Sequence, residues 1–243
     1  MPHRMLRRSS IVLSVVCGFV YLVTSPWQPY PGSVVVKGLS VGPLALLAFV
    51  AGSPLLGAAL ALSTLGDVLL DLDPVRLFVF GLGSFLVAHL VYISVFIRNR
   101  RRTVAPGASR VVLAVLVLLY SVAVSAWLLP SLGGLIVPVA IYMCAITAMV
   151  ISAILARFSN PWVAVGAILF LISDSLLAVN KFKTPIPYRD FLVWSTYYAG
   201  QYGIAIGFLT AKSKWEIGSQ AKAPAPLPTP SLVEWQIAPK RRR

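Results

Sequence analysis

Eight apolar segments follow one another along this chain, and a segment of about 20 apolar residues is long enough to cross a lipid bilayer as a helix. Proline and glycine interrupt the chain between them, as is typical of loops. Only 12% of the 243 residues are charged, whereas a soluble domain carries about 25%. The pattern predicts an all-α, polytopic integral membrane protein, a bundle of about eight transmembrane helices. The segments are 10–24, 34–52, 54–70, 76–97, 109–129, 132–155, 161–180 and 190–210.

Both ends of the chain differ from this pattern. From Lys212 the chain becomes polar and basic, with a proline-alanine tract at 221–230. We expect residues 1–211 to form the transmembrane domain and residues 212–243 a disordered cytoplasmic tail. At the other end, basic residues precede an apolar run that lacks a small-x-small cleavage site. We therefore expect a retained first helix rather than a signal peptide.

The basic residues predict the orientation in the membrane. With the N-terminus inside, 16 of the 21 Lys and Arg residues fall in the inner loops and tail, and 5 fall outside. This asymmetry predicts a multi-pass protein of the cell membrane with both termini in the cytoplasm. Since basic residues that flank membrane helices meet anionic lipid, the net charge of +14 predicts membrane lipids and no nucleic acid as partners. The sequence predicts no particular oligomeric state.

Two aspartates lie inside apolar segments. Asp67 and Asp174 each follow a small residue and begin the pattern Asp-x-Leu-Leu. A carboxylate in hydrocarbon costs about 2.5–3.5 kcal/mol on insertion scales, so it normally faces the bundle interior. A purely structural, hydrogen-bonded pair would satisfy the same constraint. We interpret the two sites as functional and predict that both carboxyl groups face a shared cavity.

Other polar residues share helix faces with these aspartates or lie on neighbouring segments. Residues separated by one or two helical turns lie on one face, which groups Asp71 with Asp67 and Lys181 with Asp174. An intramembrane histidine is also often a hydrogen-bond tie between helices, and we interpret Trp194 as an anchor at the membrane interface. The candidate substrate-binding residues are His89, Tyr92, Tyr197, Tyr198, Gln201, Asp71 and Lys181.

Several short motifs together resemble the YhhN-like family, which includes the mammalian lysoplasmalogenases. The similarity extends over residues 55–207 and excludes the tail. The resemblance implies an eight-helix membrane hydrolase that cleaves the vinyl ether of a lysophospholipid substrate, a lysoplasmalogen, to a fatty aldehyde and a glycerophospho-base. The motifs are Gly66-Asp67, Gly81, Phe85, His89 and Tyr92; Gly166-Ala167, Phe170, Ser173-Asp174 and Leu177; and Thr196-Tyr197-Tyr198 with Gln201.

The implied chemistry suits a pair of buried aspartates. A vinyl ether hydrolyses by protonation at carbon, and water then captures the oxocarbenium ion; glycosidases handle a similar ion with two carboxyl groups of divided role. Asp67 and Asp174 are the candidate catalytic residues, with Asp67 slightly favoured as the acid because Asp71 is a like charge one turn away. The sequence carries no recognisable metal-ligand set, and the chemistry requires neither a metal nor a cofactor.

A transporter or flippase is the main alternative, because secondary transporters also carry carboxylates at the membrane midplane. Such transporters often use helices broken by glycine or proline, and the segments of Asp67 and Asp174 show no clear break of that kind. A non-catalytic scaffold is a third alternative, but a scaffold does not need two buried acids, and burying them costs free energy.

Overall fold

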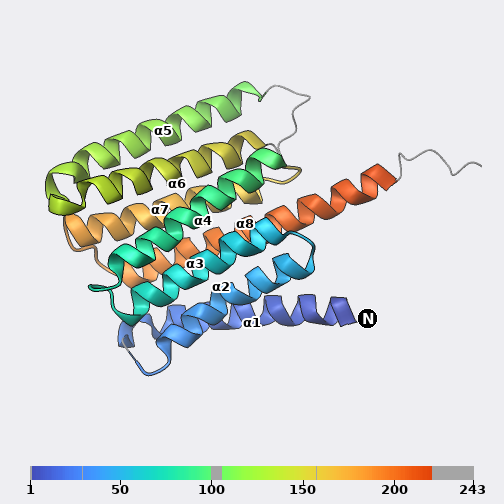
Figure 1. Cartoon of the computed structure of the whole chain (residues 1–243), viewed down its shortest axis with the longest axis horizontal. Coiled ribbons are helices and arrows are strands. Elements are labelled where there is room, and N and C mark those ends of the chain that lie inside the picture. Colours follow the sequence, from blue (N-terminus) through green and yellow to red (C-terminus); the bar gives the residue numbers. More distant parts are fainter. Residues whose placement is uncertain (1, 29, 100–105, 157, 221–243) are drawn as a thin grey trace, which may run out of the picture. The chain divides into compact units, whose positions relative to one another are not determined.

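The computed structural model describes residues 2–28, 30–99, 106–156 and 158–220, and these ranges contain helices and loops but no strand. Their helices run up and down to form a bundle (Figure 1). The α-helices are α1 (Pro2–Thr24), α2 (Ser33–Val50), α3 (Pro54–Leu72), α4 (Phe78–Arg98), α5 (Ala108–Leu128), α6 (Ile136–Ala156), α7 (Trp162–Phe182) and α8 (Arg189–Gln220). Short 3-10 helices occupy Ser25–Trp27, Leu129–Ser131 and Gly133–Leu135.

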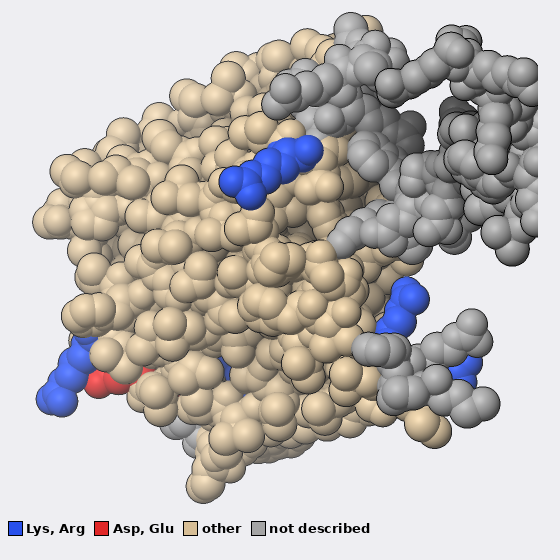
Figure 2. Space-filling view, turned by 45° about the vertical axis from the view of Figure 1, so that its right-hand side comes forward, with Lys and Arg blue, Asp and Glu red and all other residues tan. Residues whose placement is uncertain are grey.

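Seven helices of the described part, α1 to α7, are long and apolar enough to cross a membrane. Large apolar side chains on α1 and α5 point outward, as expected where lipid rather than water is the solvent. Figure 2 shows one face of the molecule, on which only a few charged side chains appear among the described residues. The predicted all-α, multi-pass membrane bundle is therefore confirmed.

The eighth helix belongs to the same bundle although its sequence is less apolar. Tyr197, Gln201 and Ile204 of α8 are buried, and the indole of Trp194 donates a hydrogen bond of 2.9 Å to the carbonyl of Gly18 in α1. Trp194 is 4% exposed, so the interpretation of this residue as an interfacial anchor is wrong: its N–H ties α8 to α1. α8 continues to Gln220, into the segment predicted to be tail. Residues 221–243 lie outside the described residues.

α7 and α8 pack with their backbones in contact. A Cβ atom at Gly166 would lie 2.6 Å from the carbonyl oxygen of Gly200, and one at Gly207 would lie 2.9 Å from the amide nitrogen of Val163. Small residues at a membrane-helix interface allow this approach. The hydroxyl of Ser173 then donates to the carbonyl of Val193, 2.9 Å away. This packing fixes how far α7 slides along α8, and with it the level of Asp174, one residue further on.

Candidate active site

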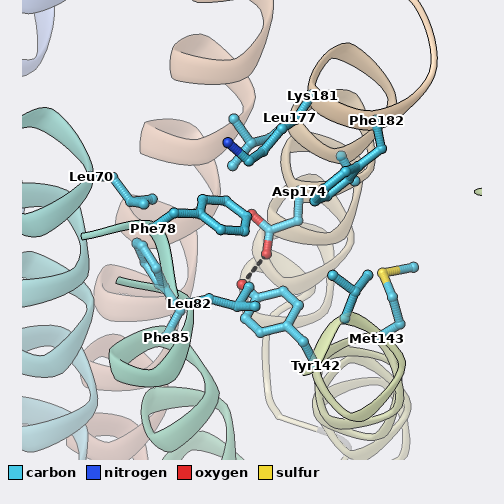
Figure 3. Close-up of a pocket in the computed structure, with 12 residues that line it drawn as sticks. Leu70, Phe78, Leu82, Phe85, Tyr142, Met143, Asp174, Leu177, Lys181 and Phe182 are labelled. Carbon is cyan, nitrogen blue, oxygen red and sulfur yellow. Dashed lines mark hydrogen bonds between the residues drawn. The ribbon is translucent and has the colours of Figure 1, made fainter. Parts of the chain in front are cut away.

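The carboxyl group of Asp174 belongs to a three-residue polar group contributed by α7, α6 and α4, with the hydroxyl of Tyr142 at its centre. The hydroxyl of Tyr142 donates a short hydrogen bond to Oδ2 of Asp174 (Figure 3). The Nε2 atom of His89 lies 3.0 Å from the same hydroxyl and 3.9 Å from Oδ2 of Asp174. His89 is fully buried, and its Nδ1 atom has no hydrogen-bond partner among the described residues.

This polar group can hold Asp174 in either protonation state. When Asp174 is ionised, Tyr142 donates to it and accepts from Nε2 of His89. When Asp174 is protonated and neutral His89 carries its proton on Nδ1, both bonds reverse, so that Asp174 donates to Tyr142 and Tyr142 donates to Nε2. A hydroxyl is both donor and acceptor, and a neutral imidazole offers one of each. Tyr142 therefore allows the carboxyl group to gain or lose a proton without breaking a hydrogen bond.

Asp174 lines a small pocket between α3, α4, α6 and α7 (Figure 3). The pocket is apolar apart from Asp174, Tyr142 and Lys181, and its cavity volume is about 50 Å³. The Nζ atom of Lys181 lies 4.1 Å from the centre of the Phe78 ring. Asp174 and Lys181 both line it, as their helical spacing predicted. The pocket thus combines one buried carboxyl group with one cationic side chain. Its lining consists of Leu70, Phe78, Leu82, Phe85, Val139, Tyr142, Met143, Asp174, Leu177, Ala178, Lys181 and Phe182.

Asp67 lies in a second polar group, formed by α3, α4 and α8. The hydroxyl of Tyr197 donates to Oδ2 of Asp67 at 2.6 Å, and Nε2 of Gln201 lies 3.3 Å from that hydroxyl. The hydroxyl of Tyr92 donates to Oε1 of Gln201 at 2.7 Å. All four side chains are buried. The Asp67 carboxylate is thus held by a chain of hydrogen bonds in which every member comes from the predicted set.

Two phenylalanines lie between these polar groups. The Phe170 ring centre lies 5.0 Å from that of His89 and 5.2 Å from that of Tyr197. Phe85 lines the pocket of Asp174 and packs edge-on against Tyr197, with 5.9 Å between ring centres. The two aspartates are close enough to interact electrostatically. Asp67 is not among the residues that line the pocket, so only Asp174 opens into it.

Asp71 and Tyr198 face other parts of the bundle. Asp71 accepts hydrogen bonds from Tyr21 at 2.6 Å and Ser33 at 3.1 Å, and Lys37 forms an ion pair with it at 3.4 Å. The hydroxyl of Tyr198 lies 2.9 Å from that of Ser14 in α1. The structure therefore gathers Asp67, Tyr92, Tyr197 and Gln201 in one polar group, with Asp174 and His89 in the other, and Lys181 at the pocket.

Sequence reasoning missed Tyr142 and Lys37. Tyr142 looked like an ordinary aromatic residue in an apolar segment, and no pattern pointed to its contact with Asp174. Lys37 carried a signal, because a lysine inside a membrane helix normally has a partner; it was assigned to the outer flank instead. Its Nζ atom lies 5.4 Å from the centre of the Tyr21 ring and 6.0 Å from that of Trp194. In the part of the chain that the structure describes, no group of three or more His, Cys, Asp or Glu could hold a metal ion.

The fold and the site together define a class: a multi-pass, all-α membrane protein with two carboxyl groups between its helices, of which Asp67 is buried and Asp174 is partly exposed. A model of the YhhN family matches residues 32–208. The chain belongs to the YhhN family, which confirms the predicted resemblance. No solved structure shows a significant match.

The curated relatives include bacterial and mammalian proteins. The chain is 37% identical over 169 residues to a protein named Lysoplasmalogenase from Mycobacterium bovis, and equally to one of that name from Mycobacterium tuberculosis. Each alignment covers 68% of this chain and 63% of the mycobacterial protein, which is less than two thirds of its length. The chain is 31% identical over 173 residues to Lysoplasmalogenase TMEM86A of Bos taurus, covering 68% of this chain and 69% of the relative.

Proposed function

We propose that this protein is a membrane-embedded hydrolase that cleaves the vinyl ether bond of a lysoplasmalogen, releasing a fatty aldehyde and a glycerophospho-base. The similarity to bacterial and mammalian proteins named lysoplasmalogenase supports this activity. The observation that carries the proposal is the carboxyl group of Asp174, buried among helices yet open to an apolar pocket with a lysine in its lining. A lysolipid presents a negative phosphate, a polar reacting bond and an apolar chain, and this pocket offers a matching environment for each.

The proposed substrate position follows from the order of residues along α7. Lys181, near the end of α7, is the cationic side chain of the pocket lining and can receive the phosphate, and Asp174 lies two turns deeper, roughly 10 Å away at 1.5 Å per residue. The vinyl ether lies next to the glycerol, so a phosphate at Lys181 brings it toward Asp174. A cavity of about 10–15 Å³ on this measure holds one water, so about 50 Å³ has room for the reacting atoms together with a water molecule.

Protonated Asp174 starts the proposed reaction by donating its proton to the vinyl carbon that does not carry oxygen. The double bond electrons form the new C–H bond, and the ether oxygen shares its lone pair to give an oxocarbenium ion. The Asp174 carboxylate then takes a proton from a water molecule as the water oxygen attacks the cationic carbon. The resulting hemiacetal loses the glycerol oxygen as an alcohol and leaves the aldehyde, so Asp174 is restored and one water is consumed. Proton transfer of this kind typically contributes 10²–10⁴ in rate.

Asp67 acts in this proposal as the ionised partner whose negative charge stabilises the oxocarbenium ion. Tyr197 donates to its carboxylate and Lys37 lies close enough to interact with it electrostatically. This assignment reverses the slight preference from sequence. That preference rested on the charge of Asp71, and Asp71 is paired with Lys37, while Asp174 is the carboxyl group that meets the pocket.

The deciding experiment offers the purified protein a panel of lysoplasmalogens and measures fatty aldehyde. The matched control is the saturated 1-alkyl lysolipid, which has an ether but no vinyl bond to protonate. Aldehyde from the vinyl ether alone supports the proposal. If neither lipid yields product but vesicles containing the protein move lysolipid between leaflets, the protein is a flippase instead.

We further propose that both termini lie in the cytoplasm. α1 and α8 are antiparallel, since Trp194 near the start of α8 bonds Gly18 near the end of α1, and the count of basic residues favours a cytoplasmic N-terminus. Reporter fusions after Arg102 and after Arg243 should both report cytoplasm. A signal from the opposite side at either position contradicts this topology.

A further inference from the structure

A long groove runs along the bundle between α5 and α6. Its cavity volume is about 480 Å³, within the range of about 300–1,000 Å³ that is typical of ligand pockets. Almost all of its lining is apolar or small, and we call it the α5–α6 groove. The lining residues from α6 are Val139, Ala140, Met143, Cys144, Thr147, Ala148 and Ile151.

Helix α5 is attached to the rest of the bundle near both ends, and the groove lies between the attachments. Near its start, Nη1 of Arg110 donates to the carbonyl of Ile154 at 2.7 Å. Just past its other end, Nζ of Lys183 donates to the hydroxyl of Ser131 at 3.3 Å and lies 5.6 Å from the centre of the Trp127 ring. Specific polar contacts therefore hold α5 in place at both ends of the space between α5 and α6.

The groove adjoins the pocket of Asp174. Val139 and Met143 line both, so one pair of side chains forms the wall between the two spaces. Methionine has a flexible, unbranched side chain that adapts to an apolar neighbour. A connection between the groove and the pocket therefore has to pass these two side chains.

We propose that the α5–α6 groove binds the hydrocarbon chain of the lysolipid substrate. The inference rests on the proposed function, and it supplies what the pocket lacks: about 50 Å³ at Asp174 is too small for a fatty chain, whereas the adjoining groove is about 480 Å³. From Val139 to Ile151 the groove follows α6 for roughly 18 Å at 1.5 Å per residue. The chain enters past Met143 and extends toward Ile151, with the vinyl ether left at Asp174.

This position predicts that substitutions at different points along α6 affect substrates of different chain length. Ala148 lines the far part of the groove and Ala140 the part next to the pocket. Ala148→Phe shortens the groove, so kcat/KM for long-chain lysoplasmalogens should fall about tenfold or more while short chains react normally, since lost contact along an apolar chain is worth about 10–200-fold. Ala140→Phe should lower kcat/KM for lysoplasmalogens of every chain length. Ala123→Phe, on the exposed part of α5 outside the groove, is the matched control and should change neither.

A binding measurement separates this inference from the proposed function. The probe is a non-hydrolysable 1-alkyl lysophospholipid with a diazirine near the chain end, and the readout is the labelled peptide. Adducts should fall on α5 near Leu118 and on α6 near Ile151, and excess unlabelled alkyl lysolipid should suppress them. If excess lysolipid suppresses the labelling but no vinyl ether is hydrolysed, the proposed function is wrong and the groove is still a binding site for the lysolipid chain.

Two outcomes overturn the inference even when hydrolysis is observed. The first is labelling of α5 and α6 that excess lysolipid does not reduce, which means that bulk membrane lipid fills the groove. The second is an equal loss for all chain lengths in Ala148→Phe, which means that the substitution disturbs packing rather than the chain site. A thermal melt of each variant in detergent accompanies the kinetics.

Discussion

The hydroxyl of Tyr197 donates a hydrogen bond to Oδ2 of Asp67 across 2.6 Å, joining two residues that are 130 positions apart in the chain. The bond links α8 to α3 inside the bundle, where neither group has access to lipid or bulk water. A charged acceptor makes such a bond roughly twice as strong as a neutral one. This contact therefore ties α8 to α3.

Replacing Tyr197 with Phe should destabilise the protein by about 1–3 kcal/mol, the cost of a buried acceptor left without its donor. A thermal melt in detergent measures the effect. In the Asp67→Asn background, Tyr197→Phe should destabilise the protein less. The hydrogen bond from Tyr197 contributes less stability when its acceptor is a neutral amide than when it is a carboxylate. A double-mutant cycle isolates this coupling. Strict additivity of the two substitutions contradicts an energetic link between Asp67 and Tyr197.

Asp174→Asn should abolish aldehyde release while the protein still inserts and folds. The amide keeps the shape and one hydrogen bond to Tyr142 but cannot donate and recover a proton, so the loss is at least about 10²–10⁴ in kcat. Asp190→Asn is the control, since Asp190 lies in the first turn of α8 and its side chain is 51% exposed. Near-normal turnover by Asp174→Asn excludes the proposed acid.

Tyr142→Phe tests the reversible hydrogen bonds around Asp174. Without the hydroxyl, both His89 and Asp174 lose their partner, and kcat should fall while KM changes little because the ring still lines the pocket. We expect a loss of about tenfold or more, in line with a charge-assisted hydrogen bond of about 1.5–3 kcal/mol. Tyr120→Phe on the exposed part of α5 is the matched control. A rise in KM alone means that Tyr142 only binds substrate.

Lys37→Met should destabilise the protein more than the paired replacement does. The side chains of Lys37 and Asp71 are 14% and 12% exposed, so removal of the lysine leaves Asp71 charged and without its cation. Breaking a buried pair costs about 3–5 kcal/mol, whereas replacing both members is often nearly neutral. We expect Lys37→Met combined with Asp71→Asn to recover much of the loss in a denaturation assay. If both variants lose the same stability, the ion pair is not the cause, and the lysine stabilises the protein through the packing of its methylene groups.

Gly200→Ala should disrupt the packing of α7 against α8. A Cβ atom at Gly200 would lie 2.9 Å from the carbonyl oxygen of Gly166 and 3.0 Å from the amide nitrogen of Phe170, and backbone cannot move aside as a side chain can. Overpacking of this kind typically costs about 1–3 kcal/mol. Gly83→Ala is the control, because its Cβ atom would meet nothing within 4 Å. Equal stability of the two variants in a thermal melt refutes the close approach of α7 and α8.

The sequence by itself determined the class of fold and the number of helices. Hydrocarbon provides no hydrogen-bond partners, so each apolar segment of sufficient length must satisfy its backbone as a helix. The same constraint singled out Asp67 and Asp174, because a carboxylate inside such a segment must face other helices. Spacing along one helix also predicted that Asp174 and Lys181 lie on one face, and both line the pocket.

Only the tertiary structure decided which partner each aspartate has. Tyr142 reaches Asp174 from α6 and Tyr197 reaches Asp67 from α8, and these pairings depend on how each helix is rotated and how far it slides past its neighbour. Glycines at the α7–α8 contact set that register by letting two backbones touch. Asp71 also shows what helical spacing cannot predict. It shares a helix face with Asp67, but its carboxylate forms an ion pair with Lys37 of α2 and is not part of the polar group of Asp67. Helical periodicity specifies the direction of a side chain from its own axis, and long-range packing specifies what it meets there.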